Sequence, residues 1–191
     1  MHRISQGPAH EGDNPSAWSH RLPVILLALV GCGVATYLTL YQWHITPSVW
    51  DPIFGARSSE AVLTSSISRL IPIPDATLGA IAYLVEAALG GAGGVARWRT
   101  APRLVLLFGV VLAGLALTSL ALVLSQVLLV HALCSLCLGS AAISWLNAWL
   151  GRGEVLASLA HVQRPAARHS PGRIRPDPSM TSPTQHAEEA R

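Results

Sequence analysis

The sequence predicts an all-α integral membrane protein: a bundle of four transmembrane helices with one long outward loop between the first and the second. Of its 191 residues, 51% are hydrophobic and only 12% are charged, and the mean hydropathy is positive at +0.43. Soluble domains carry about twice that share of charge. The chain also contains apolar runs near the length of about 20 residues that a helix needs to cross a membrane.

Each span follows from one of these runs. The first is expected from about Leu22 to Ile45, which is too long for a signal peptide and has no clean small-residue cleavage site after it. A shorter second span is expected from about Pro74 to Leu89, before the glycine-rich run at 90–94. The apolar block from Leu104 to Leu150 is about twice the length of one span, so we expect it to fold back near residues 125–130 as spans three and four.

The two ends of the chain differ from this apolar middle. Residues 1–20 and 151–191 are rich in Pro, Ser, Arg, Ala and His and lack apolar periodicity, so we expect disordered tails around a membrane domain at 21–150. Arginines gather next to the tails and between spans two and three, whereas only Arg57 and Arg69 fall in the loop. The positive-inside rule then places both termini in the cytoplasm of a multi-pass inner or plasma membrane protein.

The basic pI of about 9.1 follows from this topology. Because the arginines are scattered and no nucleic-acid motif is present, we expect membrane lipid as the surrounding partner and no nucleic acid.

The stretch VHALCSLCLGS at 130–140 places Cys134 and Cys137 at the start of the fourth span, near the outer surface of the membrane. Cysteines at i and i+3 share one helix face, and a helix N-terminus stabilises a thiolate. Redox chemistry and the packing of two small apolar residues both agree with this spacing. A metal site is not expected, because only His131 stands nearby and there is no second CxxC.

Four features together resemble the vitamin K epoxide reductase family, membrane four-helix bundles that couple thiol–disulfide chemistry to quinones. They are CSLC at the start of the last span, a long outward loop after the first, the Val62–Ser65 stretch, and the loop exit Ile73–Tyr83. The resemblance covers about residues 22–150. It implies a membrane thiol–quinone oxidoreductase that supports disulfide formation outside the cytoplasm.

The same resemblance implies the reaction partners. The substrate would be a menaquinone, ubiquinone or phylloquinone-like quinone, with no metal cofactor. A thioredoxin-fold protein or a small thiol on the outer face would donate the electrons.

The resemblance also implies roles for individual residues. Cys137 would face the quinone, and Cys134 would be its exchange-side partner. Ser65 falls where the family has a loop serine that supports the redox site, and Asp75 falls where an asparagine of the animal enzymes hydrogen-bonds the quinone. An aspartic acid kept neutral by apolar surroundings could donate the same bond. His131, about one helical turn before Cys134, is a candidate proton donor to the quinone.

Each of these substrate-binding residues also has a local explanation. Ser65 suits the end of a loop helix, and Asp75 suits the first turn of the second span, where an acid complements the helix dipole. His131 suits a solvated position at the membrane interface.

The chain departs from the family pattern in its outward loop, which lacks the usual cysteine pair and marks a divergent, bacterial-type member. Ser59 stands where the inner loop cysteine would fall, and the outer one would lie near Asp51. Cys32 lies inside span one, and Ala141 stands where the animal enzymes have a tyrosine. Direct exchange with a thiol donor would then require an exposed Cys134. The alternative is a non-catalytic membrane scaffold that kept the fold and lost the relay.

Two further features of the spans are open to interpretation. Apart from Asp75 in the first turn, Glu86 is the one acid inside span two, where it is either a functional group or a side chain that reaches water or Arg97. Gly109 and Gly114 in span three are expected to allow close helix packing.

Overall fold

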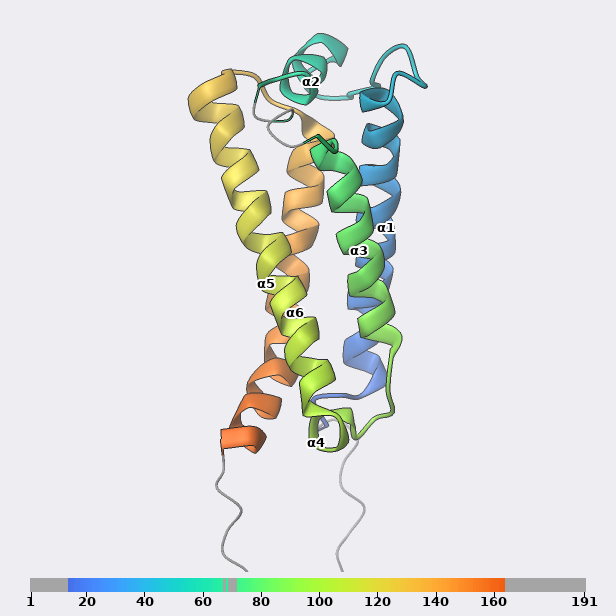
Figure 1. The fold of residues 1–191 in the computed structure, drawn as a ribbon, viewed down its shortest axis with the longest axis vertical. Helices are drawn as coiled ribbons and strands as arrows, with labels where there is room; N and C mark the ends of the chain where they lie inside the picture. The colour runs from blue at the N-terminus through green and yellow to red at the C-terminus, as the bar shows by residue number, and fades with distance from the viewer. Residues whose placement is uncertain (1–13, 67, 69–71, 164–191) are drawn as a thin grey trace, which may run out of the picture.

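The computed structural model describes residues 14–163 except 67 and 69–71, and every regular element in this part of the chain is helical. Four long helices run side by side along the long axis of the molecule (Figure 1). These are α1 (Trp18–Gln42), α3 (Asp75–Gly91), α5 (Pro102–Ser125) and α6 (Ser135–Gln163). The all-α class is therefore confirmed, and the fold-back lies close to its predicted position.

Shorter elements occupy the two ends of this bundle. α2 (Ala56–Leu63) covers one end, next to the π-helical turn η2 (Gln126–Val130) that follows α5. α4 (Arg97–Thr100) lies at the opposite end, where the first and last described residues also lie (Figure 1). We refer to them as the α2 end and the α4 end.

The helices begin and end where local chemistry allows it. Pro102 is the first residue of α5, where its missing N–H removes no helical hydrogen bond. Asp75 opens α3 directly after Pro74 and places an acid in the first turn. At the α4 end, both Arg21 and Arg97 donate hydrogen bonds to the carbonyl oxygen of Gly90 near the end of α3. These bonds satisfy acceptors that the end of a helix leaves open.

The distribution of side chains is the reverse of that in a water-soluble bundle. Large apolar side chains point outward, among them Leu26, Val110 and Leu117 at 55%, 68% and 68% exposed. Polar side chains point inward, including Glu86 and Asn147 at 1% and 0%. Two segments, α1 and the run from Pro102 to Val130, are long and apolar enough to cross a membrane. The bundle is therefore suited to a lipid surrounding.

Close helix contacts depend on glycines. A Cβ on Gly31 would lie 2.7 Å from the Tyr83 ring, so α1 and α3 approach closely only because this position lacks a side chain. Gly109 likewise lies against Val155, which confirms it as a packing position. The same expectation for Gly114 is wrong, because nothing lies within 4 Å of its Cβ direction and the residue lines a cavity.

The predicted C-terminal tail begins too early. α6 continues to Gln163, because Glu154 is buried at 5% exposed and pairs with Arg97, whose side chain is 0% exposed. Ser16 also bonds to Glu154, and α1 already begins at Trp18, before the expected boundary at residue 21. The tail prediction is thus wrong for 151–163, while residues 1–13 and 164–191 lie outside the described residues.

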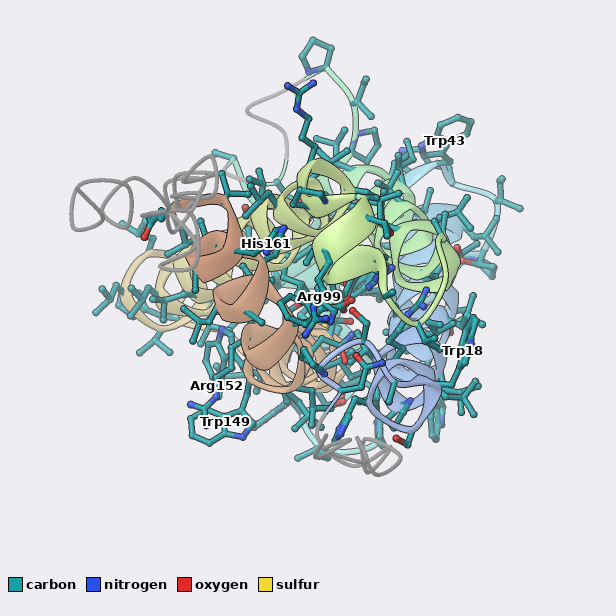
Figure 2. All side chains as sticks on the ribbon, turned by 90° about the horizontal axis from the view of Figure 1, so that it is seen from below. Trp18, Trp43, Arg99, Trp149, Arg152 and His161 are labelled. Atoms are coloured by element: carbon teal, nitrogen blue, oxygen red, sulfur yellow. The ribbon has the colours of Figure 1, made fainter. Side chains whose placement is uncertain are left out.

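Aromatic side chains surround the α4 end. Seen from this end, Trp18 and Trp149 project from the rim of the bundle on different sides, and Arg152 lies beside Trp149 (Figure 2). The Arg152 guanidinium is 3.2 Å from the Trp149 ring centroid, and that of Arg21 is 4.3 Å from Trp18. Exposed tryptophans paired with arginines are typical of the level where a bundle meets lipid headgroups.

Candidate functional site

The CxxC motif lies at the α2 end, where the chain enters α6. The carbonyl of Cys134 accepts a hydrogen bond from the Leu138 N–H (3.0 Å), the first of the helix. The N–H of Cys137 donates to Cys134 Sγ over 3.2 Å, so a sulfur takes the place that a capping oxygen usually takes. Both cysteines are thiols in this structure.

This setting activates one of the two sulfurs. A hydrogen bond from the Cys137 thiol is the main cause that lowers the pKa of Cys134 to about 7, with smaller contributions from Ser59 and the Cys137 N–H against the opposing effect of burial. Because the thiolate is the nucleophilic form, Cys134 is the stronger candidate for attack on a disulfide near neutral pH.

A buried aspartate joins the loop to the start of α6. Asp51 Oδ2 accepts hydrogen bonds from the Ser59 hydroxyl (2.5 Å) and from the Ser135 N–H (2.8 Å). Its other oxygen, Oδ1, accepts from the N–H groups of Ile53 and Phe54, each at 2.9 Å. Burial favours a higher pKa for Asp51, but these hydrogen bonds outweigh it and hold the pKa below its usual range. Asp51 thus fastens the loop to α6 as an ionised group.

Two more contacts close the same end over the motif. The Ser58 hydroxyl donates to the Leu133 carbonyl (2.6 Å) and accepts from the Leu133 N–H (3.0 Å). Gln126 Oε1 accepts from the Cys134 N–H over 3.0 Å. As a result, Cys134 is 0% exposed. The exposed Cys134 that direct exchange requires is therefore not the arrangement in this structure.

A cavity of about 650 Å³ opens beneath the closed end, within the usual size range of small-molecule sites. Cys137, Ser65 and Asp75 line it close to α2, and Cys134 is not among its lining residues. Further along, its walls come from α1, α3, α5 and α6 and are mostly apolar, with Gly114 leaving room on the α5 side. Three of the five predicted site residues, Cys137, Ser65 and Asp75, thus line the same cavity.

Asp75 lines the mostly apolar cavity, as expected, but hydrogen-bond donors surround its carboxylate. Its Oδ1 accepts from Gln42 Nε2 and from the Ser68 hydroxyl, both at 2.6 Å. Ser65 Oγ accepts from the Ser68 N–H at 3.4 Å. Gln42 was not predicted as a site residue, although its place as a polar residue at the end of an apolar span was a signal for it.

His131 lies away from this group. It is exposed, has a left-handed backbone (φ 52°) that turns the chain after η2, and is not among the cavity-lining residues. Residues 131–134 are not helical, so the expected helical-turn relationship to Cys134 is wrong.

Two polar residues that were not predicted as site residues, Tyr83 and Ser144, line the cavity toward the α4 end. The Tyr83 hydroxyl donates to the Ser140 carbonyl over 2.6 Å and lies 2.7 Å from Ser144 Oγ. One turn further along, Asn147 Nδ2 donates to Glu86 Oε1 over 2.7 Å. Glu86 therefore faces the interior, and the expected contact with water or an arginine is wrong.

No group of three His, Cys, Asp or Glu side chains suited to a metal ion occurs among the residues that the structure describes. The groups of this site that could take part in a reaction are thus the thiols of Cys134 and Cys137, the Asp51 carboxylate and the polar residues around the cavity.

Comparison with known proteins adds one finding. Residues 22–151 match the family model of the vitamin K epoxide reductase family. This range contains both cysteines of the motif, the loop that covers them and the helices that line the cavity. No curated protein matches the chain.

Proposed function

Because the chain belongs to the vitamin K epoxide reductase family, whose members are membrane oxidoreductases, we propose that it is a thiol–quinone oxidoreductase. The observation that carries the proposal is the position of Cys137 on the wall of the 650 Å³ cavity, with Cys134 directly behind it. One thiol faces a space of suitable size for a quinone ring, and the other faces the loop. A pair arranged in this way can exchange electrons with different partners on its two sides.

The proposed reaction couples two exchanges that balance. The Cys134–Cys137 dithiol loses two electrons and two protons as its disulfide bond forms, and the quinone gains both to become a quinol. A second dithiol, from a thioredoxin-fold protein or a small thiol, then reduces the disulfide through a mixed disulfide and is itself oxidised. The net result is a new disulfide in the donor and a reduced membrane quinone.

The cavity explains how a quinone would be held. Apolar walls suit the ring and its tail, while Ser65 and Asp75 supply polar groups near Cys137. Asp75 accepts bonds from Gln42 and from Ser68, which also lines the cavity, so it would act mainly by keeping Ser68 in place beside the ring. This chemistry fits a menaquinone, ubiquinone or phylloquinone-like ring.

We further propose that all four long helices cross the membrane, with the α4 end in the cytoplasm. α3, with 17 residues, spans about 26 Å at about 1.5 Å per residue, close to the hydrocarbon thickness of about 30 Å. Arginines concentrate at the α4 end, as the positive-inside rule requires of a cytoplasmic face. The α2 end, and with it Cys134, would then face the compartment in which disulfides form.

A second candidate function is a non-catalytic membrane scaffold. The complete burial of Cys134 under α2 favours it, because no donor thiol can reach this sulfur while the end is closed. The two candidates differ in one respect: the enzyme must open the α2 end during turnover, and the scaffold need not.

The testing experiment measures quinone reduction by the purified protein in lipid nanodiscs with a dithiol as donor. Cys134→Ser and Cys137→Ser should each abolish turnover, whereas Cys32→Ser, which changes a thiol bonded to the Ala80 carbonyl inside the bundle, should retain it. Unchanged turnover in Cys137→Ser would remove the enzymatic proposal. In cells, a Cys137→Ala variant should accumulate mixed disulfides on Cys134, and a scaffold should accumulate none.

A further inference from the structure

Two buried polar side chains in the middle of the bundle are incompletely paired. Glu86 of α3 and Asn147 of α6 are 1% and 0% exposed, and Asn147 Nδ2 donates to Glu86 Oε1 over 2.7 Å. This leaves Glu86 Oε2 and Asn147 Oδ1 buried, with no hydrogen-bond partner among the described residues. Both leftover atoms belong to the same pair of side chains, and both are acceptors.

One proton accounts for both leftover atoms. If Glu86 carries it on Oε2, this oxygen becomes a donor that can pair with Asn147 Oδ1, the other unpaired acceptor of the same two side chains. A buried carboxylate would instead need a cation, because an unpaired charge in an apolar interior is costly. The two buried arginines are already engaged: Arg97 pairs with Glu154, and Arg21 bonds to carbonyls at the end of α3.

The pair lies one helical turn below the cavity. Tyr83 precedes Glu86 by three residues on α3, and Ser144 precedes Asn147 by three on α6, so both lie on the same faces one turn toward the α2 end. Their hydroxyl oxygens are 2.7 Å apart, and both residues line the cavity. The two hydroxyls therefore lie one helical turn nearer to Cys137 than the acid does, on the same two helix faces.

We propose that Glu86, held neutral by Asn147, stores a proton and supplies it through Tyr83 and Ser144 to the quinone as it is reduced. This inference rests on the proposed function. Two electrons reach the quinone from the Cys134–Cys137 dithiol. One of the two protons that complete the quinol comes from the Tyr83 hydroxyl, which regains it from Glu86.

The proton balance closes over a full turnover. Two protons leave the thiols as the disulfide forms: one becomes the second proton of the quinol, and the other returns through Tyr83 and Ser144 to Glu86 in place of the one that it supplied.

The first test asks whether Glu86 holds a proton, and it requires no activity. Infrared spectra of the protein in nanodiscs should contain a carbonyl band of a protonated carboxylic acid that shifts in ²H₂O. The band should vanish in Glu86→Gln, which keeps the size and pairing capacity of the side chain. It should persist in the matched control Glu60→Gln, which changes a half-exposed acid on α2. Absence of the band from the wild-type spectrum would overturn the proposal.

The second test asks whether this proton is used. Glu86→Gln should slow quinone reduction by about tenfold or more at unchanged KM for the quinone, and Glu86→Asp should restore part of the rate. A band that depends on Glu86 together with a wild-type rate in Glu86→Gln would overturn the role in proton supply. A wild-type protein that reduces no quinone would overturn the proposed function and this role with it, while the infrared band would still report the protonated pair.

Discussion

The Ser59 hydroxyl donates a hydrogen bond of 2.5 Å to Asp51 Oδ2, and together these side chains fasten the loop to the first residue of α6. The resemblance to the family places a pair of loop cysteines at or near these two positions. By that resemblance, the hydrogen bond between Ser59 and Asp51 stands where the family has a thiol pair. It holds the loop over Cys134 but cannot carry electrons to it.

This arrangement divides the two thiols between two surroundings. Cys134 is covered by the loop at the α2 end, and Cys137 faces the cavity. A donor can reach Cys134 only if the contacts of Asp51 and Ser58 open, whereas a quinone reaches Cys137 without that movement. The loop contacts therefore limit only the access of the donor thiol to Cys134, and not the access of the quinone to Cys137 in the proposed cycle.

Removing the loop carboxylate should both destabilise and open the protein. Asp51→Ala leaves the Ser59 hydroxyl and the Ser135 N–H without their acceptor, which should lower the free energy of unfolding by about 1–3 kcal/mol. Thermal unfolding in detergent tests the stability, and the alkylation rate of Cys134 tests the opening. Glu60→Gln should change neither, and an unaltered alkylation rate in Asp51→Ala would contradict the role of Asp51 in closing the α2 end.

Acid should weaken the same contact. Because the pKa of Asp51 in the folded protein lies below the ordinary value of about 3.9, its contribution to stability is complete above that value. The contribution is lost as the pH falls through the lower, folded-state pKa. The stability difference between wild type and Asp51→Ala should therefore shrink in strong acid, and a constant difference across this range would contradict an ionised Asp51.

The Cys134 thiol should titrate near neutral pH. Ultraviolet absorbance of the reduced protein should report a thiolate that forms with a midpoint near pH 7, below the ordinary value of about 8.5. Cys137→Ala removes the main cause of this shift and should raise the midpoint, whereas Cys32→Ala should not. The lowered pKa also stabilises the fold above about pH 8.5, and this contribution is lost as the pH falls through about 7. An unchanged midpoint in Cys137→Ala would show that the two thiols do not interact.

Filling the cavity should weaken quinone binding without loss of the fold. Gly114→Leu places a side chain in open space at the cavity wall and should raise the KM for the quinone by about tenfold, the equivalent of about 1.4 kcal/mol of binding. Gly33→Leu is the matched control, because it also has open space around it but lies on the exposed face of α1. Equal kinetics in the two variants would argue against this cavity as the quinone site.

The ion pair at the α4 end should be essential for stability. Arg97→Leu leaves Glu154 as an unpaired buried charge and should cost about 3–5 kcal/mol, whereas Arg99→Leu on the exposed side of α4 should change stability by less than about 0.5 kcal/mol. The double variant Arg97→Leu/Glu154→Leu should recover part of the loss. A double-mutant cycle of thermal unfolding measures this recovery, and strict additivity would contradict the pairing.

Features set by local sequence could be predicted well. The long apolar runs indicated helices at the observed places, and the position of CSLC directly after the fold-back placed Cys134 at the start of α6. Helix ends that depend on distant partners could not be predicted. Residues 151–163 begin with two glycines and the acid Glu154, which favoured a tail, but this part of α6 packs on the bundle with Glu154 paired to Arg97, 57 residues earlier.

The candidate site shows the same division. Ser59 and Asp51 were recognised as departures in the loop, but their bond to each other and to Ser135 depends on how the loop folds back. The cavity could not be predicted either, because it is the space that four helices leave open beside Gly114. Glu86 drew attention as an acid in a span, yet only packing against α6 identifies Asn147 as its partner.

The central claim is that Cys134 and Cys137 cycle against a membrane quinone, and the thiol state of this pair tests it most directly. Alkylation-shift mass spectrometry on native membranes, with and without added quinone, measures the fraction of the pair that is a disulfide. The account predicts a dithiol that converts to the disulfide when quinone is supplied, and a slower conversion in Gly114→Leu at the same subsaturating quinone concentration. A pair that stays in one state under both conditions would contradict the account and favour the scaffold.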